Sequence, residues 1–376
     1  MIFGRAGARQ IGAHSDRARR LLSAFDDPML RSAEPRVASL AAVVAARPRL
    51  LADLAPHKTM AAGLSARFDD PRLAQLYGRY ATYVGTSPGR APALLDLVSD
   101  AEARGVWRIE GGMAALPRAI AALAREQGAQ VLTGVAVEQL RRDARGWRID
   151  ISPGESLSAG TVVFAGDPAA LRRGLLGSEV RTAVAGSAVA PRSLSAVVAS
   201  FAAQATGTDL AYHNVFFSDE VNAEFAEIDA GRLPGDATLY LCALDRGAGP
   251  TAGPERFEII LNAPAGLTLT FEERRRCLHA ILTRLGRFGL RFDPEPSPSD
   301  LTTPEEFATL FPGSEGALYG LRPTGLTSAL RRPRARTALP GLYLAGGGAH
   351  PGAGLPMAAL SGRHAAEAIL KDRAST

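Results

Sequence analysis

The chain has 376 residues, of which 46% are hydrophobic and 22% charged, and its formal net charge at pH 7 is +5. This composition is ordinary for a globular protein with a sizeable core, and it excludes a mainly disordered chain. The cysteines are Cys242 and Cys277, which lack a CxxC spacing, so a disulfide scaffold is excluded and no metal site is expected.

The positive charge comes almost wholly from scattered arginines, because Lys58 and Lys371 are the only lysines. A nucleic-acid-binding protein would gather its basic residues beside aromatic ones, so no nucleic-acid partner is expected. No apolar run has the length of a membrane-spanning helix, and the first residues contain no apolar signal-peptide segment. We therefore expect a cytosolic chain or one bound to the cytosolic face of a membrane.

The first hundred residues predict helices. Asp70 followed by Pro71 is a helix start, with an N-cap residue and proline at the first helical position. Apolar side chains then recur at helical spacing at Leu73, Leu76, Tyr77 and Tyr80. This face predicts core packing, with the lining of a cavity for an apolar ligand as the alternative.

An α/β region is expected next. Strands are predicted at residues 106–109, 131–133, 135–140, 147–151 and 161–165, with a helix after the Gly111-Gly112 turn. From about residue 192 to 263, apolar runs separated by Gly and Pro predict a second, largely antiparallel sheet. Thr270 and Glu273 form a capping-box pattern that opens a helix behind it.

The most informative segment is the last strand–loop–helix unit. A strand at 342–345 leads into Gly346, Gly347 and Gly348, where glycine permits a positive φ and the close approach of a flat ligand. Pro356 fits the first position of the next helix, whose N-terminal amides suit an anion or a ring that becomes anionic on reduction. A ligand-free turn needs only one glycine, so this loop favours a bound ligand.

The dinucleotide fingerprint G-x-G-x-x-G is absent from the chain. Counted from Gly346 its sixth position is Pro351, and counted from Gly352 it is Met357. The phosphate-binding P-loop is absent as well, because neither lysine follows a glycine.

The segment AGGGAHPGAGLPMAALSGRHAA (residues 345–366) resembles the closing flavin motif of the carotenoid (phytoene-type) desaturases, which are FAD enzymes among the amine-oxidase-like flavoproteins. Further segments that resemble this family are RYATYVG (79–85), WRIEGGM (107–113), QVLTGVAVEQL (130–140), AYHNVFFS (211–218), YLCALDR (240–246) and LFPGSEGALYG (310–320). Within the family, the segments at 79–85, 240–246 and 345–366 are most similar to the hydroxyneurosporene (1-hydroxycarotenoid 3,4-) desaturases.

The resemblance implies an α/β (α+β) fold of three parts. These are a helical cap (1–105), an incomplete Rossmann-like FAD-binding domain (106–180 and 335–376), and a substrate domain with a mostly antiparallel sheet (181–334). Because the family's members open with a β-α-β unit that carries the fingerprint, the chain looks like an N-terminally truncated member.

The function implied is FAD-dependent desaturation of an acyclic hydroxy or methoxy carotenoid such as hydroxyneurosporene. Such an apolar substrate implies a peripheral contact with the inner membrane from the cytoplasmic side. Two alternatives stay open. One is another amine-oxidase-like flavoprotein, acting on phytoene or an amine; the other is a non-catalytic fragment that binds no flavin.

The resemblance also implies cofactor contacts. Gly346, Gly347 and Gly348 would lie against the flavin, with Leu355, Pro356 and Met357 at the helix start beneath it. Val137 matches a contact to adenine, Gly112 a turn near the flavin ring, and Asp167 a strand end beside the cofactor. A plain strand residue, a turn and a helix start are the alternative interpretations of these three.

Two histidines are weak candidates for an acid or base. His350 lies in the glycine-rich loop, and His213 lies in the β-rich run. For His213, a hydrogen-bonded structural role is the alternative.

Overall fold

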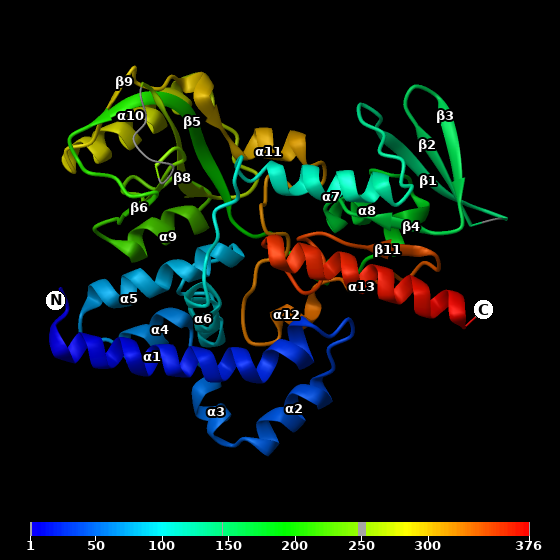
Figure 1. Ribbon diagram of the computed structural model, residues 1–376, viewed down its shortest axis with the longest axis horizontal. Helices are drawn as coiled ribbons and strands as arrows, with labels where there is room; N and C mark the ends of the chain where they lie inside the picture. Colours follow the sequence, from blue (N-terminus) through cyan, green and yellow to red (C-terminus); the bar gives the residue numbers. More distant parts are fainter. Residues whose placement is uncertain (1, 145, 247–252, 376) are drawn as a thin grey trace.

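The computed structural model describes residues 2–144, 146–246 and 253–375, which fold into helices and open sheets (Figure 1). The predicted mixed class of helices and sheets is confirmed. The helices are α1 Gly4–Phe25, α2 Val37–Ala46, α3 Arg49–Leu54, α4 Met60–Ser65, α5 Pro71–Gly78, α6 Val98–Ala103, α7 Ala115–Glu126, α8 Pro168–Arg173, α9 Val221–Asp229, α10 Phe271–Arg287, α11 Pro304–Leu310, α12 Ser328–Arg331 and α13 Leu355–Ala374.

Short helical turns and strands complete the described chain. The turns are η1 Asp26–Leu30, η2 Arg79–Val84, η3 Ala93–Leu97, η4 Glu179–Thr182, η5 Gly186–Ala188 and η6 Pro298–Asp300. The strands are β1 Val137–Asp143, β2 Gly146–Ile151, β3 Glu155–Ala159, β4 Val162–Phe164, β5 Ser195–Thr206, β6 His213–Phe216, β7 Leu239–Ala243, β8 Glu255–Ala263, β9 Arg291–Asp293, β10 Leu301–Thr302 and β11 Leu342–Leu344.

Helices α1 to α6 gather in the lower part of Figure 1, and they are called the cap below. The predicted start of α5 is confirmed, since the Asp70 side chain accepts a hydrogen bond from the Arg72 amide and Pro71 begins the helix. In the cap interior Asp96 is buried and pairs with Arg17 and Arg67. A buried carboxylate needs such partners, because a lone charge loses its hydration.

The largest sheet is open and antiparallel, as the sequence predicts, in the strand order β10-β5-β8-β7-β6 with β9 also pairing with β5. Its long strand β5 runs beside β8 from Ser195 to Ala203. Helix α10 opens with the predicted capping box and buries Cys277, Ile281 and Leu285 in the core that this sheet shares.

Two smaller sheets belong to the other end of the molecule (Figure 1). Strands β1, β2 and β3 form an antiparallel meander, and β11 pairs with β4 in parallel. The fully buried Trp147 of β2 donates a hydrogen bond from its indole to the Pro340 carbonyl, 3.3 Å away, which ties the meander to the segment that enters β11.

The strands predicted at 106–109 and 131–133 are wrong, because the structure has irregular backbone at both places. A strand forms only where a neighbour supplies its hydrogen bonds, and no described strand lies beside these segments. The helix between them, α7, buries none of its residues. Its side chains Ile120 and Leu123 are 58% and 57% exposed.

The core of the largest sheet provides a stability test. Phe257 is 1% exposed, so Phe257→Ala should lower the free energy of unfolding by about 3–5 kcal/mol through lost burial and a cavity. Phe271→Ala is the matched control, because Phe271 is 66% exposed and should change the free energy by under about 0.5 kcal/mol. If urea unfolding shows the same loss of unfolding free energy in both variants, the burial of Phe257 in this core is contradicted.

Candidate functional site

The parallel pair β4–β11 brings two sequence-distant loops together. The carboxyl ends of parallel strands meet at one edge of a sheet, and ligands of open α/β sheets bind outside that edge. Here β4 leads to Asp167 and Pro168, while β11 leads to Gly346, Gly347 and Gly348. The contact is close, because a Cβ added to Gly348 would meet the Pro168 ring at 2.5 Å.

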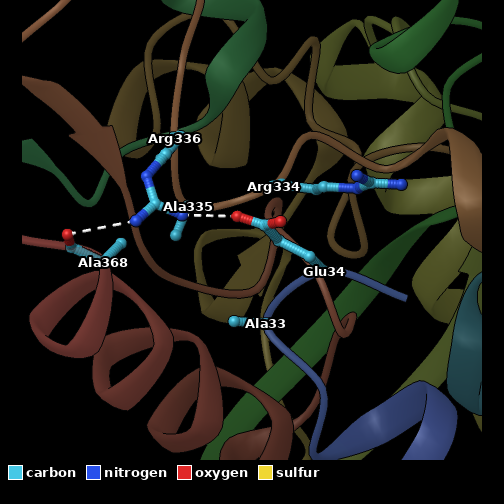
Figure 2. Close-up of a pocket in the computed structure, with 6 residues that line it drawn as sticks. All are labelled: Ala33, Glu34, Arg334, Ala335, Arg336 and Ala368. Atoms are coloured by element: carbon cyan, nitrogen blue, oxygen red, sulfur yellow. Dashed lines mark hydrogen bonds and ion pairs between the residues drawn. The ribbon is translucent and has the colours of Figure 1, made fainter. Parts of the chain in front are cut away.

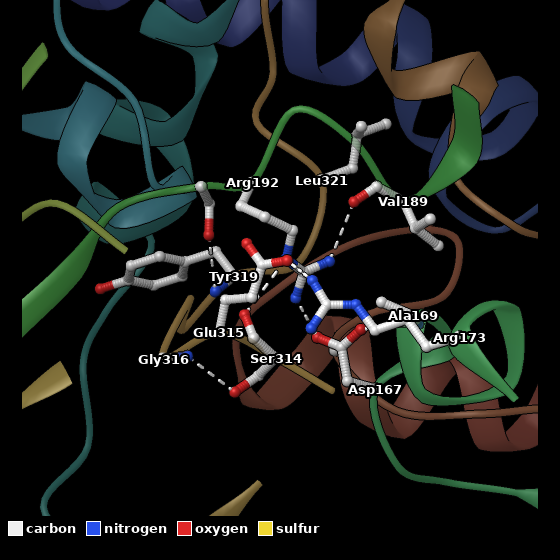
Figure 3. Close-up of polar contacts among 12 residues, drawn as sticks. Asp167, Ala169, Arg173, Val189, Arg192, Ser314, Glu315, Gly316, Tyr319 and Leu321 are labelled. Atoms are coloured by element: carbon white, nitrogen blue, oxygen red, sulfur yellow. Dashed lines mark hydrogen bonds and ion pairs between the residues drawn. The ribbon is translucent and has the colours of Figure 1, made fainter. Parts of the chain in front are cut away.

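Asp167 has both carboxylate oxygens engaged by the fold (Figure 3). One accepts a hydrogen bond from the Ala169 amide at 2.9 Å and caps α8, and the other pairs with Arg192. The Arg192 guanidinium also donates to the Val189 and Ser314 carbonyls, at 3.0 and 3.2 Å. The predicted strand end therefore connects β4 to the segment that enters the largest sheet, and a cofactor contact by Asp167 stays a prediction.

Arg332 is the main residue that the sequence interpretation missed. Its buried guanidinium donates to the carbonyls of Gly347, Tyr319 and Leu321, at 3.0, 2.7 and 3.1 Å. Burial lowers the pKa of Arg332 to about 10, against the opposing charge of Asp167. The signal in the sequence is the group of four arginines at 331, 332, 334 and 336, which the pattern alone does not connect to the glycine loop.

The glycine loop is also held from the α13 side. The Gly346 amide donates to the Ser361 hydroxyl at 2.7 Å, and that hydroxyl donates to the Ala358 carbonyl. At the start of α13 no side chain caps the helix at Gly354, and Leu355 is 53% exposed. A long helix thus presents uncapped amides and an apolar side chain beside the loop.

Gly347 differs from Gly346 in whether the fold itself requires a glycine at that position. Gly346 has φ +95°, and a Cβ on it would lie 2.9 Å from the Ala165 carbonyl oxygen, so the fold itself requires glycine. A Cβ on Gly347 would meet only the Ala353 Cα, at an ordinary 3.7 Å. Packing within the chain therefore does not explain glycine at 347, whereas a flat ligand lying against the loop does.

His350 lies in the loop but points toward the cap. Its Nε2 is 2.9 Å from the Ser32 carbonyl, and its ring stacks on that of His364, which contacts the Arg31 carbonyl. Burial lowers the pKa of His350 to about 4, so its ring is neutral at pH 7. The two histidines anchor the segment between η1 and α2, and an acid–base role for His350 stays a prediction.

A hollow of about 250 Å³ lies beside the same anchored segment, and Figure 2 shows the residues that line it. Its wall includes Glu34, which pairs with Arg336, and Ala368 of α13, whose carbonyl accepts a hydrogen bond from Arg336. The hollow is smaller than common ligand pockets and contains no residue of the glycine loop. We therefore do not assign a cofactor to it.

His213 lies where the cap approaches the largest sheet. Its Nδ1 is 2.6 Å from the Tyr240 hydroxyl on the neighbouring strand. Burial lowers the pKa of His213, and the charges of Glu102 and Arg79 act on it from the cap in opposite directions. Burial also raises the pKa of Tyr240, and the nearby Cys242 and then Tyr83 of the cap raise it further. Tyr83, His213 and Tyr240 are named the hydroxyl cluster below.

Val137 and Gly112 lie on segments separate from the glycine loop. Val137 begins β1, is 43% exposed and precedes a register shift in the pairing with β2. Gly112 has φ +80° with open space where a Cβ would lie, so the turn conformation alone explains its glycine. Their contacts with a cofactor stay predictions, as do those of Leu355, Pro356 and Met357.

Comparison with known proteins identifies the family. The family model for flavin-containing amine oxidoreductases matches residues 54–209 and 269–370. The chain belongs to this family. Hydroxyneurosporene desaturase from Cereibacter sphaeroides is 52% identical over 98% of this chain and 76% of its own length. The hydroxyneurosporene desaturase from Rhodobacter capsulatus is 46% identical over 94% of this chain and 72% of its own length.

Among solved structures, a putrescine oxidase variant aligns over 96% of this chain and 76% of its own length, with 15% identity and a TM-score of 0.46. The assignment depends on the family model and the sequence relatives.

As a member of the flavin-containing amine oxidoreductases, the protein is an oxidoreductase with FAD as its cofactor. The site fits such a group on the observations above, since Gly347 leaves room against the loop and the α13 amides are uncapped. The flat flavin ring and the charge that it gains on reduction match these two features.

The glycine loop predicts contrasting variants. Gly347→Ala should leave the free energy of unfolding within about 0.5 kcal/mol of the parent and weaken FAD binding on the order of tenfold, because the methyl group occupies the ligand's side of the loop. Gly346→Ala, the matched control, should lower the unfolding free energy by about 1–3 kcal/mol through strain. Urea unfolding and FAD titration measure both, and a stability loss in Gly347→Ala equal to the control would contradict the assignment.

The buried His350 predicts a loss of stability in acid. Its pKa is about 4 in the folded state and about 6.5 when unfolded, so only the unfolded chain takes up this proton as the pH falls from 6.5 to 4. This proton uptake lowers the free energy of unfolding by at most about 3 kcal/mol. The decrease is complete below pH 4, where His350 is protonated in both states.

The variant His350→Gln should flatten the acid limb of the unfolding free energy, because glutamine keeps a donor but does not titrate. His57→Gln, at an exposed histidine, is the control and should leave that limb unchanged. Chemical unfolding at a series of pH values measures the effect. An unaltered slope in His350→Gln would show that His350 titrates normally in the folded protein.

Proposed function

We propose that the protein desaturates an acyclic hydroxy or methoxy carotenoid, such as hydroxyneurosporene, with FAD as the electron acceptor at its site. The observation that carries this proposal is the high identity to hydroxyneurosporene desaturases over nearly the whole chain. The glycine loop, which contains room for a flat ring at Gly347, supports it independently.

In this proposal the FAD-binding part is residues 106–180 and 335–376, the substrate part is 181–334 and the cap is 1–105. FAD would be held by Gly346, Gly347, Gly348, Leu355, Pro356 and Met357, with Val137, Gly112 and Asp167 as further contacts. When bound, FAD supplies a two-electron acceptor for a hydride equivalent. The buried Arg332 holds the Gly347 carbonyl and so maintains the loop against which the ring would lie.

Desaturation removes two hydrogens from neighbouring saturated carbons and forms a C=C bond. One hydrogen leaves with the bonding electron pair toward the acceptor, and the other leaves as a proton. The proton acceptor in the protein must be unprotonated at working pH, and partial or full burial lowers the pKa of both His213 and His350, which favours that form. His213 is exposed toward the cap, whereas His350 is buried against Ser32, so His213 is the better placed of the two.

The hydroxyl cluster is the part that would recognise the polar end of the substrate. A hydrocarbon chain offers no hydrogen bonds, so the hydroxyl or methoxy group is what a protein can use for discrimination. The Tyr240 hydroxyl and the His213 ring supply donors and acceptors on the sheet side, and Tyr83 lies on the cap side with Arg79 5.0 Å from its ring centre.

We further propose that the protein associates peripherally with the cytoplasmic face of the inner membrane. A long apolar substrate is held in a bilayer, so the enzyme must reach the lipid surface. Among the residues that the structure describes, none of the helices combines the length and apolar character that crossing a membrane requires.

The chain supplied with FAD should convert a 1-hydroxylated acyclic carotenoid into a product lacking two hydrogens, seen by mass spectrometry and by absorption at longer wavelength. The double variant Tyr83→Phe/Tyr240→Phe should reduce the preference for the hydroxylated carotenoid over the parent hydrocarbon about tenfold, since two hydroxyl groups that could bond its polar end are removed while His213 stays in place. Tyr343→Phe is the control, because the Tyr343 hydroxyl donates to Asp372 on α13.

The outcomes separate the parts of the proposal. No turnover of any carotenoid by the FAD-loaded chain would contradict the desaturase function. A chain that retains no FAD would favour the non-catalytic alternative. If the chain turns over carotenoids but the double variant keeps the preference for the hydroxylated carotenoid, only the role of the hydroxyl cluster is contradicted.

A further inference from the structure

Helix α2 exposes an apolar face. Its ten residues, Val37–Ala46, include no charged residue, and none of them is buried. A helix with one serine and otherwise apolar residues normally lies in a protein core or in lipid. The exposed residues follow helical spacing and are Val37, Ala38, Ala41, Ala42, Ala45 and Ala46, with Ser39 as the one polar residue beside them.

Helix α3 also exposes an apolar side chain, and both helices project from the lower edge of the molecule in Figure 1. Val37 is 68% exposed and Leu51 is 58% exposed. On the inner side, α3 packs through Leu50 and Leu54 on the core around Leu21 and Phe25. Helix α2 adds the partly buried side chains Leu40, Val43 and Val44 to the same cluster. The exposed face is therefore fixed in orientation by a packed base.

Polar contacts hold this unit, here named the α2–α3 hairpin (residues 36–58), at both ends. Before it, His350 and Arg334 contact the carbonyls of Ser32 and Pro35. Near its end, Asp53 pairs with Arg20 at 2.8 Å. The hairpin is thus mounted on the cap and on the C-terminal unit, so its apolar face stays in one direction.

The hairpin is also strongly basic. It contains Arg36, Arg47, Arg49 and Lys58, and its acidic residue Asp53 is already paired with Arg20. These four basic side chains are exposed, and none forms an ion pair within the described ranges 2–144, 146–246 and 253–375. Unpaired positive charge around an apolar face matches the lipid–water boundary of an anionic bilayer.

We propose that the α2–α3 hairpin is the element that docks the protein onto anionic lipid. Its outward apolar side chains enter the acyl boundary, while Arg36, Arg47, Arg49 and Lys58 contact the headgroups. The helices are too short to span a bilayer, so they lie in its interface. This inference deepens the proposed membrane association and rests on it, but it is independent of the carotenoid chemistry.

Vesicle flotation tests the proposal with the FAD-loaded chain. Vesicles with 30% phosphatidylglycerol in phosphatidylcholine should bind the protein, and pure phosphatidylcholine should bind it far more weakly. The variant Arg36→Gln/Arg47→Gln/Arg49→Gln should lose on the order of a hundredfold in affinity, about fivefold for each arginine. Val37→Asp/Leu51→Asp should also abolish flotation, since it places carboxylates in the apolar face.

The matched control is Ile120→Asp/Leu123→Asp on α7, where the two side chains are 58% and 57% exposed. It should float as the parent does. Circular dichroism of each variant shows whether it is folded, and the arginine variant tests the proposal even if an aspartate variant does not fold.

Three outcomes would overturn the inference. If the parent binds no vesicles, the proposed membrane association fails together with it. If the α7 variant loses binding and both hairpin variants keep it, the membrane association stands and the hairpin is the wrong element. If the parent is a dimer in solution that Val37→Asp/Leu51→Asp makes monomeric, while vesicle binding is unchanged, the face is an interface between two copies.

Discussion

The arrangement of the site depends on one buried guanidinium. Within the described residues, the hydrogen bonds of the Arg332 side chain go to carbonyls from two segments, the glycine loop at Gly347 and the chain at Tyr319 and Leu321. A buried cation must keep such acceptors, because it regains no hydration inside the protein. The loop, the segment that enters β11 and the residues beside the largest sheet are therefore held as one unit.

The Asp167–Arg192 pair adds a second connection in the same place. Its two side chains are only about a tenth exposed, and Arg192 also reaches the Ser314 carbonyl. Removing either partner would leave a buried charge unpaired, which costs more than the pair itself contributes. The turn after β4 and the segments that flank the largest sheet thus share polar contacts that neither could satisfy alone.

The apolar surface of the molecule divides into parts of different character. The hairpin at α2 and α3 carries unpaired basic residues around alanine and valine. The segment from Val106 to Val137 exposes larger side chains, among them Trp107 at 79% and Leu132 at 59%, on backbone that is largely irregular. The hairpin is packed on its inner side, whereas α7 has no buried residue, so only the hairpin presents its apolar face from a fixed base.

The sequence by itself determined the mixed fold class, the antiparallel sheet, the start of α5, the capping box of α10 and the glycine-rich loop before α13, because each depends on local residue patterns. It failed at residues 106–109 and 131–133, since a strand also needs a neighbour that local pattern does not supply. Only the tertiary structure decided that Arg332 supports the loop, that His350 faces Ser32, and that His213 meets Tyr240. These contacts join residues far apart in the chain, and their geometry exists only once the elements have packed.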